Sequence, residues 1–135
     1  MCTIIDCRLP RIALRPIKCY KVILKCGDGF CSPYQHKTVI LNSYQKAEGK
    51  IIFNDIFSRY LDKGVIHSFV FRHDAAYLQR DLQIMWLNHC FKKSYFVIEC
   101  YIPRFTIYWK GTFSFMDTYC SKKIFFKEII DYPKF

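Results

Sequence analysis

Glycine and proline are scarce in this chain, with five of each among 135 residues. Disordered chains and flexible linkers are rich in these residues and poor in aromatic side chains, yet 19% of this sequence is aromatic. No internal repeat, low-complexity tract or glycine–serine linker divides the chain. We therefore expect a single domain over residues 1–135, with residues 1–16 as an extended arm because Pro10 and Pro16 interrupt sheet pairing.

Long apolar runs are also missing. Lys or Arg interrupts every stretch before it reaches the roughly 18 apolar residues of a membrane-spanning helix. Asp6 and Arg8 break the apolar amino-terminal segment, so it does not have the core of a secretory signal. We expect a cytoplasmic protein without a membrane partner, whose eight cysteines are mostly buried structural thiols in a reducing compartment.

Several chemical signatures are absent. The chain has no G-x-S-x-G, H-E-x-x-H, P-loop or G-x-G-x-x-G motif, so hydrolase, zinc-peptidase and mononucleotide-binding functions have no local support. No C-x-x-C occurs either. Cys2 and Cys7, like Cys26 and Cys31, have C-x4-C spacing. A packing role is the favoured interpretation of these four thiols, with a four-thiolate zinc site as the alternative.

Acidic residues are in the minority. Asp and Glu number 11 against 21 Lys and Arg, which gives a formal net charge of +10. Such an excess favours an anionic partner, either a nucleotide-type small molecule, an acidic protein surface or a nucleic acid. Because the basic residues are scattered along the chain, a solvated surface that aids solubility is the alternative.

Alternating hydrophobicity predicts a series of strands. Residues 17–26 alternate clearly, residues 27–29 (Gly-Asp-Gly) favour a tight hairpin, and the chain returns as a strand from Phe30 that is broken at Pro33. Further strands or short apolar segments are expected at 37–41, 65–71, 94–102, 105–110 and 121–130. Loops are expected at 42–50 and around Gly111, Met116 and Asp117, while 51–61 is compatible with a helix or a strand.

One amphipathic helix is predicted over residues 74–89, starting at Asp74. Its apolar stripe consists of Ala75, Leu78, Leu82, Met85, Trp86 and His89, and it should dock on the sheet. The expected fold class is therefore α+β, with a mostly antiparallel sheet and one main helix packed on it.

The junction between the strand at 65–71 and this helix is the leading candidate site. A rigid strand fixes His67 and Ser68 there, while the helix start offers free backbone N–H donors. Because His67 and Ser68 alternate along the strand, only one of them should line a pocket, and a hydrogen-bonded core histidine is the alternative for His67. The candidate ligand-binding residues are Tyr20, Lys21, His67, Ser68 and Lys110. No catalytic or metal-binding residue and no cofactor is predicted.

Nucleic-acid binding is an alternative, since it needs cations for phosphates and exposed aromatics for base stacking. The chain offers Tyr20, Lys21, Lys25, Arg104, Tyr108, Trp109, Lys110, Lys122, Lys123 and Lys127. Aromatics this abundant mostly fill cores, so the stacking role depends on their exposure.

Two resemblances follow from particular motifs. The first rests on Cys19–Lys21, Ser32–Tyr34, Gly64–Phe69, Asp74–Ala76, Val97–Pro103, Tyr108–Gly111 and Tyr119–Ile124. In this order, over nearly the whole chain, these motifs are similar to those of a set of small uncharacterised proteins of gut bacteria and their phages. That resemblance implies no activity, although phage-associated proteins of this size are often accessory or anti-defence factors that bind a host protein or a nucleotide signal.

The second resemblance is to ADP-ribosyltransferases, which present a basic residue on an early strand, a serine on a strand before a helix and a glutamate on a late strand. Lys21 and Ser68 match the first two positions, whereas the late strand over 119–124 has no glutamate. Without that carboxylate, which orients the ribose and stabilises the developing positive charge, the resemblance implies binding rather than catalysis.

The leading hypothesis is therefore a basic, non-enzymatic binding domain for an anionic ligand or partner, with its site near Lys21, His67 and Ser68. The alternative from another class is an NAD-dependent transferase, in which Ser68 and Tyr20 position the cofactor. Glu128 or Glu99 would then supply the acid group.

Overall fold

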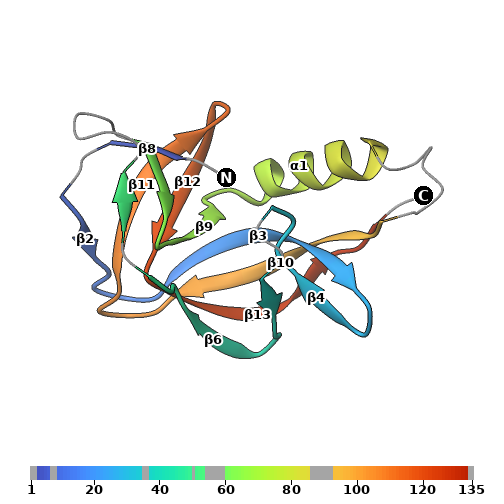
Figure 1. The fold of residues 1–135 in the computed structure, drawn as a ribbon, viewed down its shortest axis with the longest axis horizontal. Helices are drawn as coiled ribbons and strands as arrows, with labels where there is room; N and C mark the ends of the chain where they lie inside the picture. The colour runs from blue at the N-terminus through green and yellow to red at the C-terminus, as the bar shows by residue number, and fades with distance from the viewer. Residues whose placement is uncertain are drawn as a thin grey trace.

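The computed structural model describes residues 3–6, 9–34, 37–49, 51–53, 60–85 and 93–133. Within these ranges, 13 strands join in one sheet whose pairings are antiparallel, and helix α1 (Arg72–Met85) covers part of one face (Figure 1). The strands are β1 (Thr3–Ile5), β2 (Arg11–Ile12), β3 (Ile17–Cys26), β4 (Gly29–Cys31), β5 (Thr38–Val39), β6 (Ser43–Lys46), β7 (Ile52–Phe53), β8 (Tyr60–Lys63), β9 (Ile66–Phe69), β10 (Tyr95–Ile102), β11 (Ile107–Phe113), β12 (Met116–Ser121) and β13 (Lys123–Asp131). The α+β class with one helix is confirmed.

Strand β10 lies at the centre of the longest paired region. The order along the sheet is β6-β13-β10-β3-β9-β12-β11-β1-β8-β7, and β10 pairs with β3 along its whole length and with β13 on its other side. Val97 and Ile98 point to opposite faces and are both 0% exposed, so apolar groups cover β10 from both sides, as its sequence predicts.

The two faces of the central strands carry different cores. On the helix side, Val22 and Val97 pack with Phe69 and with Leu78 and Leu82 of α1. On the opposite side, the core consists of Ala13, Cys19, Ile23, Val39, Ile66, Ile98, Cys100, Ile102, Tyr108, Tyr119, Ile124 and Phe126. The alternation of β3 therefore sends neighbouring side chains into separate cores, and this determines which side chains can meet at a site.

Helix α1 begins at Arg72, two residues before its predicted start, so Asp74 lies in the first turn rather than before it. A carboxylate in that turn interacts favourably with the helix dipole. Ala75, Leu78 and Leu82 are buried as predicted, but Met85 is 57% exposed, which contradicts its place in the predicted stripe. Trp86 and His89 lie outside the described residues.

Two glutamines occupy buried positions on this helix. Gln79 Nε2 donates to Tyr95 O over 2.9 Å, and Gln83 Oε1 accepts from Tyr95 N over 3.0 Å. They satisfy backbone groups at the start of β10, which explains why polar side chains are buried there. No helix within the described ranges combines the length and the apolarity that crossing a bilayer requires.

The amino-terminal residues take part in the sheet, contrary to the expected arm. Strand β1 lies between β11 and β8, and β2 pairs with β11. Gly111 permits this, because a Cβ at that position would collide with the carbonyl oxygen of Ile4 and the side chain of Thr3.

Two predicted loops are strands. Residues 43–46 form β6 on β13, and Gly111, Met116 and Asp117 belong to the hairpin of β11 and β12. Ser114 and Phe115 make its turn with φ values of 49° and 67°, a conformation usually signalled by Asn-Gly. The range 51–61 contains β7 and the start of β8, while 54–59 lies outside the described residues.

The predicted hairpin after β3 is present, and Cys26 and Cys31 are joined across it by a disulfide with a Cα–Cα distance of 6.1 Å. This corrects the expectation of free thiols at these two positions. Cys19, Cys100 and Cys120 are buried, as expected of structural thiols. Cys2 and Cys7 lie outside the described residues, and the described part of the chain contains no cluster of three His, Cys, Asp or Glu side chains suited to a metal ion.

Candidate functional site

The candidate site is a pocket where β3 and β9 separate. These neighbouring strands share one paired position, Tyr20 with Phe69, and continuing that register would bring Val22 opposite His67. Instead, the Lys21 ammonium donates a hydrogen bond to His67 O over 2.9 Å. The Lys21 side chain thus replaces the backbone hydrogen bonds that would continue the pairing of β3 with β9. The two strands separate at this point, and the opening between them forms the pocket.

Three segments besides β3 and β9 close the pocket: the turn after β4, the end of β6 and helix α1. The lining residues are Lys21, Val22, Ser32, Pro33, Tyr34, Lys37, Gln45, Lys46, Ala47, Val65, Ile66, His67, Phe69 and Leu78. The cavity volume is about 60 Å³. One water needs roughly 10–15 Å³ of a cavity, so the pocket accommodates a few waters or one small group.

The pocket concentrates positive charge. Lys21, Lys37 and Lys46 line it, and no acidic residue occurs among its described lining residues. None of the three lysines forms an ion pair with a carboxylate of the described chain. Lys46 also lies directly opposite Lys123 in the β6–β13 ladder, where like charges repel. An anion in the pocket would relieve this repulsion.

Lys21 is the least solvated of these cations. Burial lowers its pKa below the usual value, while the nearby thiols of Cys100, Cys19 and Cys120 act weakly in the opposite direction. Burying an ammonium group without a counter-charge is unfavourable, so the protein retains Lys21 here at a cost in stability. A bound anion would stabilise the protonated form of Lys21.

Neutral polar groups also line the pocket. Ser32 Oγ accepts a hydrogen bond from Lys37 N over 3.1 Å, and Ser32 N donates to Lys37 O over 2.9 Å, so these two residues lie side by side. Burial first, and the charge of Asp81 second, raise the pKa of Tyr34, so its hydroxyl remains a proton donor.

The His67 side chain is a buried, hydrogen-bonded group. It is 5% exposed, and its Nδ1 lies 3.0 Å from Thr3 Oγ1 and 3.3 Å from Cys120 Sγ. This is the arrangement expected of a core histidine. Its contribution to the site is the carbonyl oxygen that holds Lys21.

Of the five predicted ligand-binding residues, Lys21 and His67 come together at the pocket and the other three do not line it. Ser68 points to the other face of β9, is 1% exposed, and its Oγ has no hydrogen-bond partner among the described residues. Tyr20 lies on the face of β3 opposite Lys21, and Lys110 is exposed on β11.

The sequence interpretation missed Lys37 and Lys46. Lys37 is placed locally, by its hydrogen bonds to Ser32 and by the short β4–β5 hairpin, in which it directly precedes β5. Lys46 lies in a segment with the composition of a loop and reaches the pocket because β6 pairs with β13, far along the chain. No local pattern indicates such pairing.

The aromatic residues proposed for base stacking do not support a nucleic-acid interface. Trp109 is 4% exposed and Tyr108 is 9% exposed, so both belong to the interior. Stacking requires an accessible ring face.

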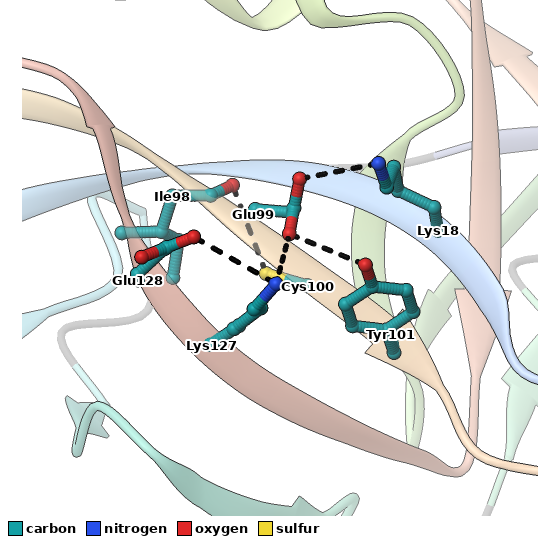
Figure 2. Close-up of polar contacts among 7 residues, drawn as sticks. All are labelled: Lys18, Ile98, Glu99, Cys100, Tyr101, Lys127 and Glu128. Carbon is teal, nitrogen blue, oxygen red and sulfur yellow. Dashed lines mark hydrogen bonds and ion pairs between the residues drawn. The ribbon is translucent and has the colours of Figure 1, made fainter.

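A second group of lysines surrounds Glu99 on the opposite face of the sheet from Lys21 (Figure 2). Lys18 and Lys127 lie 3.4 Å and 3.2 Å from its carboxylate, and the Tyr101 hydroxyl donates to it over 3.3 Å. Burial alone would raise the pKa of Glu99, but the two ammonium groups outweigh it and lower the pKa below its usual value. Glu128 lies 3.7 Å from Lys127 and is exposed.

Comparisons with protein-family models, with curated proteins and with solved structures gave no match.

Proposed function

We propose that this protein is a non-enzymatic binding domain that holds a small anionic group, of phosphate type, in the pocket between β3 and β9. The observation that supports this most directly is the grouping of Lys21, Lys37 and Lys46 around one cavity whose described lining contains no carboxylate. Unneutralised cations in a partly enclosed site attract anions more strongly than the same charges on an open surface.

The size of the pocket narrows the ligand class. A volume of about 60 Å³ is well below the roughly 300–1,000 Å³ of sites that enclose a whole small-molecule ligand, which favours a small group such as a phosphoryl. A nucleotide-type ligand would therefore insert a terminal phosphate and leave its base and sugar outside. The hydroxyl of Tyr34 and the amide of Gln45 supply further polar contacts.

Binding is favoured over transferase chemistry by the positions of the acidic residues. Neither Glu99 nor Glu128, the two candidates for an acid group, lines the pocket. Glu99 is held by Lys18 and Lys127 on the other face of the sheet. A reacting group bound beside Lys21 would find no described carboxylate within the pocket to stabilise a developing positive charge.

Isothermal titration with inorganic phosphate, pyrophosphate, AMP and adenosine tests the proposal. We expect the three phosphate-bearing compounds to bind and adenosine not to bind. Lys37→Ala should lower the affinity for phosphate about tenfold or more, since a hydrogen bond to a charged group contributes about 1.5–3 kcal/mol. Lys25→Ala, which removes an exposed cation of β3 outside the pocket, is the control. Equal losses in both variants, or tight binding of adenosine, would overturn the proposal.

A further inference from the structure

An apolar patch lies where β2 meets the start of β11, at the outer margin of the molecule (Figure 1). Its exposed side chains are Ile12 (58%), Leu14 (79%), Phe105 (67%) and Ile107 (41%). We call these four residues the β2 patch. Single exposed apolar residues are ordinary, but a contiguous group of four large ones marks an interaction surface.

Backbone pairing places the segment that carries Ile12 and Leu14 beside the segment that carries Phe105 and Ile107. Ile12 lies directly opposite Ile107. Ala13 N donates to Thr106 O over 3.0 Å, and Phe105 N donates to Ala13 O over 2.7 Å. Ala13 and Thr106 are buried at 1% and 7%, so alternation turns their neighbours outward.

Three arginines lie in the same two segments as the β2 patch, and these segments contain no acidic residue. Arg11, Arg15 and Arg104 are all exposed, and no Asp or Glu occurs in residues 9–16 or 103–107. None of the three forms an ion pair with a described residue. The Arg104 guanidinium lies over the Phe105 ring, 4.5 Å from its centroid, which orders both side chains before any partner arrives.

Phe105 is held in an unfavourable backbone conformation. Its φ is 68°, in the left-handed region that bulky residues rarely adopt. The Phe105 side chain is also largely exposed, so burial of the ring does not offset the cost of this conformation. Strain of this kind is typical of residues retained for binding.

We propose that the β2 patch is a docking surface for an acidic protein segment that carries apolar side chains. Charge complementarity specifies the occupant: three unpaired arginines require carboxylates, and the four apolar side chains require an apolar counterpart. Arg and Phe are also the residue types enriched at the centres of protein interfaces. The proposal is independent of the phosphate-type pocket, since the two sites share no residue.

A library of random peptides of roughly 12 residues, displayed on phage, tests this without a known partner. It is selected on the full-length wild-type protein and counter-selected on the variant Phe105→Asn. We expect the retained peptides to be enriched in Asp or Glu together with Leu, Ile or Phe. Synthetic copies should bind Phe105→Asn and Arg104→Glu about tenfold or more weakly than wild type.

Phe105→Asn also separates a binding role from a structural one, because Asn tolerates a positive φ better than Phe does. We expect its melting temperature to be unchanged or raised while peptide binding is lost. Phe115→Asn is the matched control, since Phe115 has a φ of 67° and is fully exposed at the tip of the β11–β12 hairpin. It should bind the peptides as wild type does.

Four outcomes would overturn the proposal. They are the absence of peptides that discriminate wild type from Phe105→Asn, the enrichment of basic or uncharged peptides, a lower melting temperature for Phe105→Asn, and equal loss of binding in Phe115→Asn. A membrane surface would be indicated instead if wild type, but not Phe105→Asn, sediments with phosphatidylserine-containing vesicles and no peptide is selected.

Discussion

Two groups of lysines flank the central strands, and they differ in whether a carboxylate accompanies them. Lys18 and Lys127 share Glu99 on one face, whereas Lys21, Lys37 and Lys46 line a pocket without a described acidic residue. The first group is neutralised by the protein itself. The second leaves its charge available to a ligand, so net charge alone does not locate a site, while unneutralised charge around a cavity does.

The largest expected effect comes from reversing charge in each group separately. Lys37→Glu combined with Lys46→Glu should lower the affinity for inorganic phosphate about 100-fold or more, because two contacts of about 1.5–3 kcal/mol are lost. Lys18→Glu combined with Lys127→Glu should change that affinity by no more than about threefold. Isothermal titration measures both. Similar losses in the two double variants would remove the distinction between the groups.

Lys21 gives the next largest effect, through pH. Because burial lowers the pKa of Lys21 below 10.5, the side chain loses its proton at a lower pH than an exposed lysine does. Phosphate affinity should therefore decrease as pH rises through that lowered pKa. In Lys21→Met the affinity should be about tenfold weaker at neutral pH and lack this decrease. An unchanged alkaline profile in the variant would show that Lys21 does not contact the anion.

Removing the Glu99 carboxylate should leave Lys18 and Lys127 without a neutralising charge, as the lysines of the pocket are. Glu99→Gln leaves Lys18 and Lys127 without their shared acceptor, and we expect only a small fall in the free energy of unfolding, since both lysines are about half exposed and their ion pairs are screened by solvent. Chemical denaturation measures the loss. The affinity of the pocket for phosphate should not change, and a decrease would indicate that the two groups are coupled.

The smallest expected effect is a change in stability at acidic pH. The pKa of Glu99 is lowered from 4.5 by its two lysines despite its burial, so its contribution to stability is fully present above 4.5 and disappears as pH falls through the lowered value. The difference in stability between wild type and Glu99→Gln should therefore shrink in this window. A difference that stays constant down to complete protonation would mean that packing, not charge, is responsible.

Local patterns predicted the elements whose alternation is long and regular. β3, β10 and the core of α1 follow directly from period-2 and period-3.6 spacing, and the Gly-Asp-Gly turn follows from its residue types. β6 was missed because a short polar strand acquires its structure from a partner elsewhere in the chain, here β13. The start of β12 was missed because the turn that joins it to β11 is not apparent from the residue types. The Ser114–Phe115 turn gave no signal, because neither residue favours a positive φ.

Of the residues that line the site, the sequence predicted only Lys21 and His67. Lys21 and His67 lie on strands with clear patterns, and those strands became neighbours, so the two residues meet. Lys46 arrives through non-local pairing of β6 with β13, which the sequence alone does not indicate. Lys37 arrives through local contacts with Ser32, whose side-chain hydrogen bond has no pattern in the sequence. Ser68 does not line the pocket, although its neighbours Ile66, His67 and Phe69 on the same strand do. Its side chain is 1% exposed and lies opposite Tyr119 in the β9–β12 ladder, and no pattern in the sequence separates it from Ile66.

A titration with inorganic phosphate, followed by NMR of the side-chain ammonium groups in protein labelled at its lysines, tests the central claim most directly. The account predicts that the resonances of Lys21, Lys37 and Lys46 shift together with one dissociation constant, while those of Lys18 and Lys127 remain in place. Shifts centred on Lys18 and Lys127, or small uniform shifts of all lysines, would contradict it.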